Sequence, residues 1–214
     1  MSRITALRAA GRSRQNGGSK TKVFLDGRAA LTLETEAVVN QGLHVGQELS
    51  ADEMEVLTRE GHFYRCLNAA TRFLGYRPRS EAELRKRLVQ RGFQSDSIEA
   101  VIARLREQSL VDDVAFARFW KENRDTFSPR SQWLTGLELR RKGVSDDIIG
   151  MVISDVDDED SAYRAALSRG RRLPLSDYQT FHRRLADFLK RRGFSYGVIT
   201  STVRRLWQEL GQSN

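Results

Sequence analysis

A short segment that occurs three times decides the fold: RLVQRGF at residues 87–93, ELRRKGV at residues 138–144 and FLKRRGF at residues 188–194. Their glycines, Gly92, Gly143 and Gly193, are 51 and 50 residues apart. A leucine lies four residues before each glycine, and apolar residues recur one, six, ten and thirteen residues after it. We therefore interpret this part of the chain as three copies of one structural unit. The recurring apolar positions are Leu88, Leu139 and Leu189; Phe93, Val144 and Phe194; Ile98, Ile149 and Ile199; Ile102, Ile153 and Val203; and Leu105, Val156 and Leu206.

Each unit is predicted to contain three helices. The glycine predicts the end of a middle helix, because glycine adopts the left-handed conformation found at many helix ends. After it, apolar residues at i, i+3, i+4 and i+7, as in residues 98–105, predict another helix. The first helices fit upstream, at residues 62–76, 114–125 and 157–171.

Several helix starts are also indicated. Ser80-x-x-Glu83 and Ser176-x-x-Gln179 have the pattern of capping boxes. Pro129 suits a first helical position, and the acidic run 155–160 suits a helix N-terminus, where the helix dipole favours negative charge.

The first 60 residues follow a different pattern. Apolar runs at residues 22–25 and 29–33 flank Asp26-Gly27, which predicts a β-hairpin, because a tight hairpin turn needs positive φ at both central residues. A lone hairpin is marginally stable, so we expect it to pair with a strand near residues 4–8 or to pack on helices. Residues 11–20 are polar and rich in glycine, which favours a loop. A short helix over 34–41 and a second one beginning at the capping box of Ser50 complete this region.

The predicted fold is therefore mainly α: three tandem three-helix modules preceded by a small N-terminal extension that contains a β-hairpin. The predicted boundaries are residues 1–60 for the extension and 61–111, 112–156 and 157–214 for the modules.

Charge is divided into blocks. The chain has a net charge of +8, which favours polyanionic partners. Residues 1–60 are neutral, 61–110 carry ten basic and five acidic side chains, 111–163 carry seven and twelve, and 164–214 carry eleven and three. The first and third modules are thus the candidates for binding an anionic surface.

The sequence lacks the residues that most catalytic and metal-binding sites require. Cys66 is the single cysteine, and the three histidines are scattered, so neither an internal disulfide nor a zinc site is expected. A phosphate-binding glycine loop and a nucleophile with its base are also missing. We expect no catalytic residue, no metal and no cofactor. Without a long apolar run or a signal-peptide pattern, the chain is expected in the cytoplasm.

These residues resemble the RecX family of regulatory proteins. The resemblance is carried by Arg77-Pro78-Arg79-Ser80, Leu110-Val111-Asp112-Asp113, residues 139–144 and residues 188–195. It implies three helical modules that lie along the groove of a filament of RecA recombinase on single-stranded DNA. It further implies that the chain limits filament growth, ATP hydrolysis and strand exchange, and that it has no catalytic residue.

The candidate binding residues are the basic side chains of the first and third modules. Their collective density favours contact with a polyanion or an acidic partner, although each one alone could be an ordinary solvated residue. In the first module they surround Leu84 and Leu88, which are expected to face inward, and in the third they flank the apolar face of residues 185–189. The candidates are Arg77, Arg79, Arg85, Lys86, Arg87 and Arg91, with Arg171, Arg172, Arg183, Arg184, Arg191, Arg192, Arg204 and Arg205. Trp120, Trp133 and Trp207 are expected to pack in the cores.

Three functions are compatible with these residues. The first is a filament regulator that contacts RecA, with single-stranded DNA bound directly or through RecA. The second is a non-specific DNA-binding protein of the helix-turn-helix kind, with the third helix of a module in the major groove. The third is a structural helical scaffold.

Overall fold

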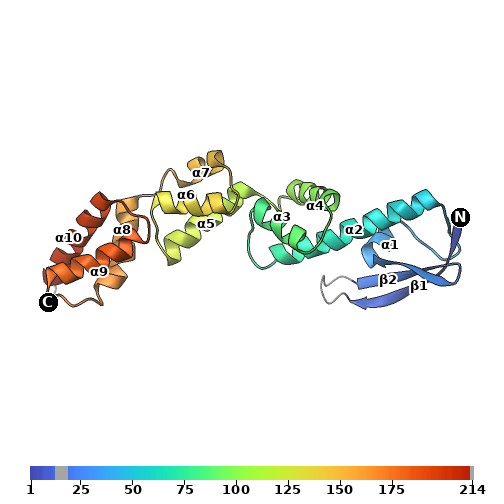
Figure 1. Cartoon of the computed structure of the whole chain (residues 1–214), viewed down its shortest axis with the longest axis horizontal. Helices are drawn as coiled ribbons and strands as arrows, with labels where there is room; N and C mark the ends of the chain where they lie inside the picture. The colour runs from blue at the N-terminus through green and yellow to red at the C-terminus, as the bar shows by residue number, and fades with distance from the viewer. Residues whose placement is uncertain (13–18, 213–214) are drawn as a thin grey trace. The chain divides into compact units, whose positions relative to one another are not determined.

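The computed structural model in Figure 1 describes residues 1–12 and 19–212 of the chain. It consists of two compact units, Met1–Asp112 and Asp113–Asn214. The first unit contains an antiparallel sheet followed by helices, and the second is helical. The predicted fold class is confirmed.

The sheet has the strand order β3-β2-β1-β4, and neighbouring strands are antiparallel. Its strands are β1 (Ser2–Arg12), β2 (Ser19–Leu25), β3 (Arg28–Glu34) and β4 (Glu48–Leu49). The predicted hairpin is confirmed: Asp26 and Gly27 join β2 to β3 with φ values of 49° and 82°. The expected earlier strand is β1, which pairs with β2. Of the loop predicted over residues 11–20, the ends belong to β1 and β2, and residues 13–18 lie outside the described part.

Helix α2 (Ala51–Leu74) connects the sheet to the first module, as Figure 1 shows. We expected separate helices beginning at Ser50 and near residue 62, and this is wrong, because α2 is continuous. Gly61 lies at the middle of α2, where a Cβ atom would come within 2.7 Å of Leu33 Cδ2 of the sheet. The cost of a glycine inside a helix is thus offset by the close approach of α2 to β3. The short helix α1 (Thr35–Asn40) is confirmed.

Each three-helix module has its own apolar core. The first is formed by the second half of α2, α3 (Glu81–Gln90) and α4 (Ser95–Glu107); the second by α5 (Asp113–Phe127), α6 (Gln132–Arg141) and α7 (Asp146–Ile153); and the third by α8 (Asp158–Gly170), α9 (Tyr178–Lys190) and α10 (Tyr196–Gln212). The recurring leucines Leu88, Leu139 and Leu189 are fully buried. Within residues 1–12 and 19–212, no helix is long and apolar enough to cross a membrane.

The recurring leucine and glycine form one local structure. Gly92, Gly143 and Gly193 have φ values of 79°, 81° and 85°, so the predicted left-handed helix ends are confirmed. The residue after each glycine donates its amide to the carbonyl of the recurring leucine, over 3.3, 3.2 and 3.4 Å. This hydrogen bond closes the helix end, and it explains why leucine and glycine recur at a constant spacing.

Two predicted helix starts and one predicted core residue need correction. Asp177, and not Ser176, caps α9: its carboxylate accepts from the amides of Gln179 and Thr180 at 3.1 and 2.8 Å. Pro129 is not in a helix, because the hydroxyl of Ser131 caps α6 two residues later.

Trp133 is 62% exposed. It points nearly opposite to the buried Thr135 on the same helix, because residues two apart on a helix face different sides. Trp120 and Trp207 pack against the second and third cores, as predicted.

Candidate functional site

Arg77 stabilises the turn before α3. Its terminal nitrogens donate to the two carboxylate oxygens of Glu83 at 3.1 and 3.0 Å, and one of them also donates to the carbonyl of Pro78 at 2.8 Å. The two charged side chains are only 30% and 20% exposed. A bidentate pair of this kind fixes both partners in position. Arg77 is therefore a structural residue of the first module.

Arg79 stacks on an aromatic ring of its own module. Its guanidinium lies 4.2 Å from the centre of the Phe73 ring, and that of Arg87 lies 5.8 Å from the same centre. Burial lowers the pKa of Arg79, and the nearby charge of Arg77 lowers it further. The Nε atom of Arg79 is buried and has no hydrogen-bond partner within the described residues. Two cations thus share one ring at the end of α2.

Arg85 is held by ion pairs, whereas its neighbours on α3 are exposed. One of its terminal nitrogens lies 3.1 Å from a carboxylate oxygen of Glu81 and 3.1 Å from one of Glu99. Sequence spacing could not reveal the second pair, because Glu99 belongs to α4. The exposed basic residues of α3 and its C-terminal end are Lys86, Arg87 and Arg91.

Most of the predicted basic residues of the third module are exposed. They come from the end of α8, from α9 and its C-terminal turn, and from α10. Within residues 1–12 and 19–212, none of them forms an ion pair, in contrast to Arg77 and Arg85. These six residues are Arg171, Arg172, Arg183, Arg184, Arg191 and Arg204. We call them the third-module arginines.

Two predicted residues of the third module also contact other residues of the chain. Arg205 donates from Nε to Glu209 at 2.8 Å and lies 4.1 Å from the centre of the Tyr163 ring. Arg192 is half-buried: one terminal nitrogen donates to the Ser128 hydroxyl and to the Pro129 carbonyl, both at 2.9 Å. Burial lowers the pKa of Arg192. Arg192 is predicted, like Arg191, to contact a polyanionic or acidic partner, and in the structure it connects the third module to the second.

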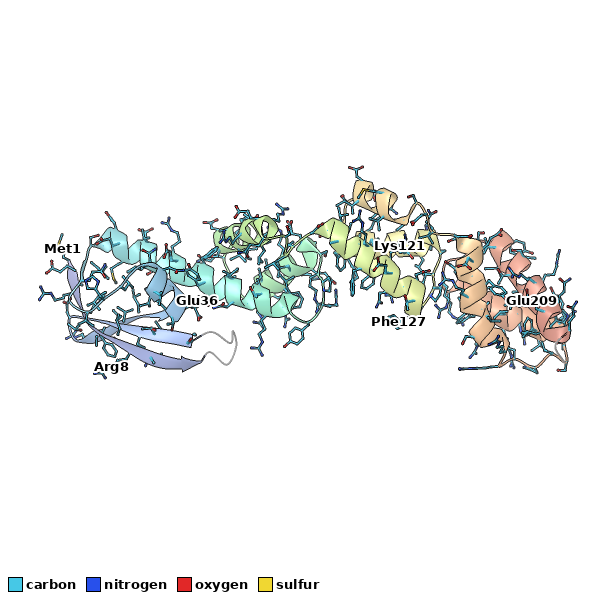
Figure 2. All side chains as sticks on the ribbon, turned by 180° about the vertical axis from the view of Figure 1, so that it is seen from behind. Met1, Arg8, Glu36, Lys121, Phe127 and Glu209 are labelled. Carbon is cyan, nitrogen blue, oxygen red and sulfur yellow. The ribbon has the colours of Figure 1, made fainter. Side chains whose placement is uncertain are left out.

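A second arginine cluster was missed by the sequence interpretation. Glu138, whose side chain is 12% exposed, pairs with both Arg124 and Arg130 and accepts from Trp120 Nε1 at 2.9 Å. Burial lowers the pKa of Arg130, and the charges of Arg124 and Arg192 lower it further. These arginines lie in the block that is acidic overall, so the count of charges by segment concealed them. Figure 2 labels Lys121 and Phe127 of α5, the helix to which Trp120 and Arg124 also belong.

The acidic run at residues 155–160 serves the start of α8. Asp157 caps the helix by accepting from the amides of Glu159 and Asp160 at 2.8 and 3.2 Å. Asp158 accepts from the amide of Gln132 at 2.7 Å, which links the third module to α6. The predicted role at a helix N-terminus is confirmed. In the part of the chain that the structure describes, no group of three or more histidine, cysteine or acidic residues is placed to hold a metal ion.

Comparison with known families gives a consistent set of relatives. Residues 66–105 match the family model of the first three-helix domain of RecX. The chain is 36% identical over 151 residues to the regulatory protein RecX of Mycobacterium sp. (strain JLS), with 67% of this chain and 80% of that protein covered. It is 36% identical over 145 residues to the RecX of Chlorobaculum tepidum, with 68% and 90% covered. The RecX of Clostridium perfringens (strain SM101 / Type A) is 29% identical over 213 residues, with 96% and 97% covered.

Solved structures share the fold. A crystal structure of a regulatory protein RecX superposes with a TM-score of 0.69 at 20% identity, covering 94% of this chain and 98% of that one. The RecX of Lactobacillus salivarius superposes with a TM-score of 0.58 at 22% identity, covering 68% and 96%. The similarity to these structures concerns the fold alone.

Proposed function

The chain belongs to the RecX family of regulatory proteins, and we propose that it binds filaments of the RecA recombinase on single-stranded DNA and inhibits them. In this proposal it acts in recombinational DNA repair and the SOS response, in the cytoplasm. It acts by binding, without catalysis and without a cofactor.

The observation that carries this proposal is the set of third-module arginines. Six exposed guanidinium groups without an ion pair in the described residues lie on one module. An isolated charge on a surface contributes little to binding, but several charges that face the same partner act together. Guanidinium groups also bind carboxylates and phosphates through two parallel hydrogen bonds. This module therefore suits a partner that presents acidic side chains, phosphates or both, as a protein filament on DNA does.

The helix-turn-helix alternative receives less support. It places the third helix of a module in the major groove, where arginine and polar side chains must reach the bases. On α4, Arg104 pairs with Glu107 at 3.4 Å and Arg106 pairs with Glu81. The sequence of α7 contains no basic residue at all. Two of the three candidate recognition helices therefore carry either no basic side chain or only basic side chains that pair with carboxylates of the chain.

Electron microscopy and ATP hydrolysis test the proposal together. Filaments of RecA on single-stranded DNA with a nucleoside triphosphate are imaged with and without the full-length chain, and the DNA-dependent ATPase is followed in parallel. We expect added density on the filaments or shorter filaments, together with a slower ATPase. Unchanged filaments and unchanged ATPase would refute the proposal and favour the scaffold alternative.

A pair of charge-reversal variants tests the surface. Replacing Arg183, Arg184 and Arg191 by glutamate should weaken ATPase inhibition by orders of magnitude, because three favourable charges become repulsive. Arg192 is left intact because it connects two modules. The matched control reverses Arg8, Lys22 and Arg28, which are exposed on the N-terminal sheet, form no ion pair within the described residues and change the net charge equally. The helical circular-dichroism signal should be retained in both variants. Equal loss of inhibition in both would show that only the total charge matters.

A further inference from the structure

A five-residue motif recurs at the same period as the helix ends. Residues 76–80, with the sequence YRPRS, precede α3, and residues 127–131, with the sequence FSPRS, precede α6. Each residue of the first copy lies 51 residues before its counterpart. In both copies the final serine caps the helix that follows, with its hydroxyl accepting an amide at 3.1 Å. The motif therefore starts the middle helix of the first and second modules.

The aromatic residue of each copy is exposed. Tyr76 is 73% exposed and Phe127 is 79% exposed, and Figure 2 shows Phe127 at the end of α5. The fold does not require this exposure. The third module has Leu173 four residues before its helix cap, and Leu173 packs against the core. Two modules thus keep a large ring in solvent at a position where the third buries an aliphatic side chain.

Each motif combines its exposed ring with cationic and polar residues in the sequence. The arginine three residues after the ring is half-buried in both copies: Arg79 stacks on Phe73 together with Arg87, and Arg130 shares Glu138 with Arg124. The residues that flank the rings are glycine, arginine, threonine and serine. Aromatic anchors of protein interfaces usually lie in a desolvated patch of further contacts. A single exposed ring among polar residues, in a motif that also contains an arginine, has instead the composition of a base-stacking site.

We propose that Tyr76 and Phe127 each stack on a base of single-stranded nucleic acid, with the phosphates beside that base contacted by the arginines of the same module. The repetition of the motif supports a ligand that repeats along its length, and a single strand offers the same pair of groups, a planar base and a phosphate, at every step. This inference deepens the proposed function, because it assigns direct contact with the DNA of the filament. The stacking sites can also be present in a chain that does not inhibit filaments.

The test measures binding of the full-length chain to a fluorescent oligothymidylate by fluorescence anisotropy. Tyr76→Ala and Phe127→Ala should each weaken binding roughly tenfold, and the double variant should weaken it further, because one stacked base is lost at each site. Tyr76→Trp and Phe127→Tyr should restore most of the affinity. The matched control is Tyr196→Ala, since Tyr196 is 82% exposed but lies outside the motif. It should bind as the native chain does. All these rings are exposed, so thermal melting should be unchanged.

An abasic strand of the same length separates stacking from charge attraction. It retains the phosphates but has no bases, so both alanine variants should bind it as tightly as the native chain does. An equal loss on the abasic strand would overturn the stacking role, and so would an unchanged affinity of both variants for oligothymidylate.

Filament inhibition by the same variants distinguishes the two proposals. Lost inhibition with unchanged affinity for the free strand would show that the rings contact the recombinase, which overturns this inference and leaves the proposed function intact. The opposite result is also informative. If the native chain does not affect filaments but its alanine variants bind the free strand more weakly, the stacking sites are supported and the filament proposal fails.

Discussion

Two of the recurring glycines should respond very differently to the same substitution. Gly92 has a φ of 79° and open space around the position of an added Cβ atom. Gly193 has a φ of 85°, but there the added atom would come within 2.6 Å of Leu134 Cβ and of the Ser131 hydroxyl. Both contacts belong to the second module, so Gly193 lies where the third module packs on the second. Alanine at the two positions therefore separates backbone strain from packing between modules.

The magnitudes follow from these two environments. Alanine at a left-handed position costs about 1–2 kcal/mol, and this is the whole expected effect of Gly92→Ala. Overpacking a close contact costs about 1–3 kcal/mol more, so Gly193→Ala should lower the free energy of unfolding by about 2–5 kcal/mol. Gly150→Ala is the control: Gly150 is inside α7 with open space around it, and alanine there should stabilise by about 0.5–1 kcal/mol.

Urea unfolding followed by circular dichroism gives the global free energies, and hydrogen exchange gives a local measure. The amide of Ser131 donates to the carbonyl of Arg192 at 3.0 Å, across the same contact between modules. In Gly193→Ala this amide should exchange faster, whereas in Gly92→Ala it should stay protected. Equal losses of stability in the two alanine variants, with the Ser131 amide protected in both, would refute the assignment of Gly193 to the contact.

Two further predictions concern side chains. Arg192→Ala removes the hydrogen bonds to Ser128 and Pro129 and the stacking on Phe188, and should lower the free energy of unfolding in urea by about 1–3 kcal/mol. The control Arg184→Ala, at an exposed position, should change this free energy by less than about 0.5 kcal/mol. Similar values for both variants would contradict the internal role of Arg192. Burial raises the pKa of the Cys66 thiol to about 12 from its ordinary value of 9.0, so iodoacetamide at pH 8 should modify it only after unfolding. Rapid labelling of the native chain would show that Cys66 is accessible. Because the folded state favours the neutral thiol, the free energy of unfolding should be independent of this group below pH 9 and should fall as the pH rises from 9 towards 12.

The sequence by itself determined the features that depend on neighbouring residues. A helix end of this kind needs a glycine in the left-handed conformation and a hydrogen bond from the next amide to the leucine carbonyl five residues before that amide. Both residues lie in one short segment, so the three modules were predictable from its repetition. The hairpin was predictable for the same reason, because Asp26 and Gly27 define the turn locally. The wrong predictions, a break in α2 and a buried Trp133, concern positions where contacts with other elements decide the outcome.

Only the tertiary structure decided which arginines a partner can reach. Arg85 and Arg191 both follow a helical pattern beside buried leucines, yet Arg85 pairs with Glu99 of another helix and Arg191 is exposed. Arg191 and Arg192 are adjacent, but only Arg192 donates to Ser128, which lies 64 residues away along the chain. An ion pair or hydrogen bond depends on the distance between two groups in space. Residues far apart in the sequence acquire that distance only when the helices pack, so the local pattern of charges cannot show which cations remain available.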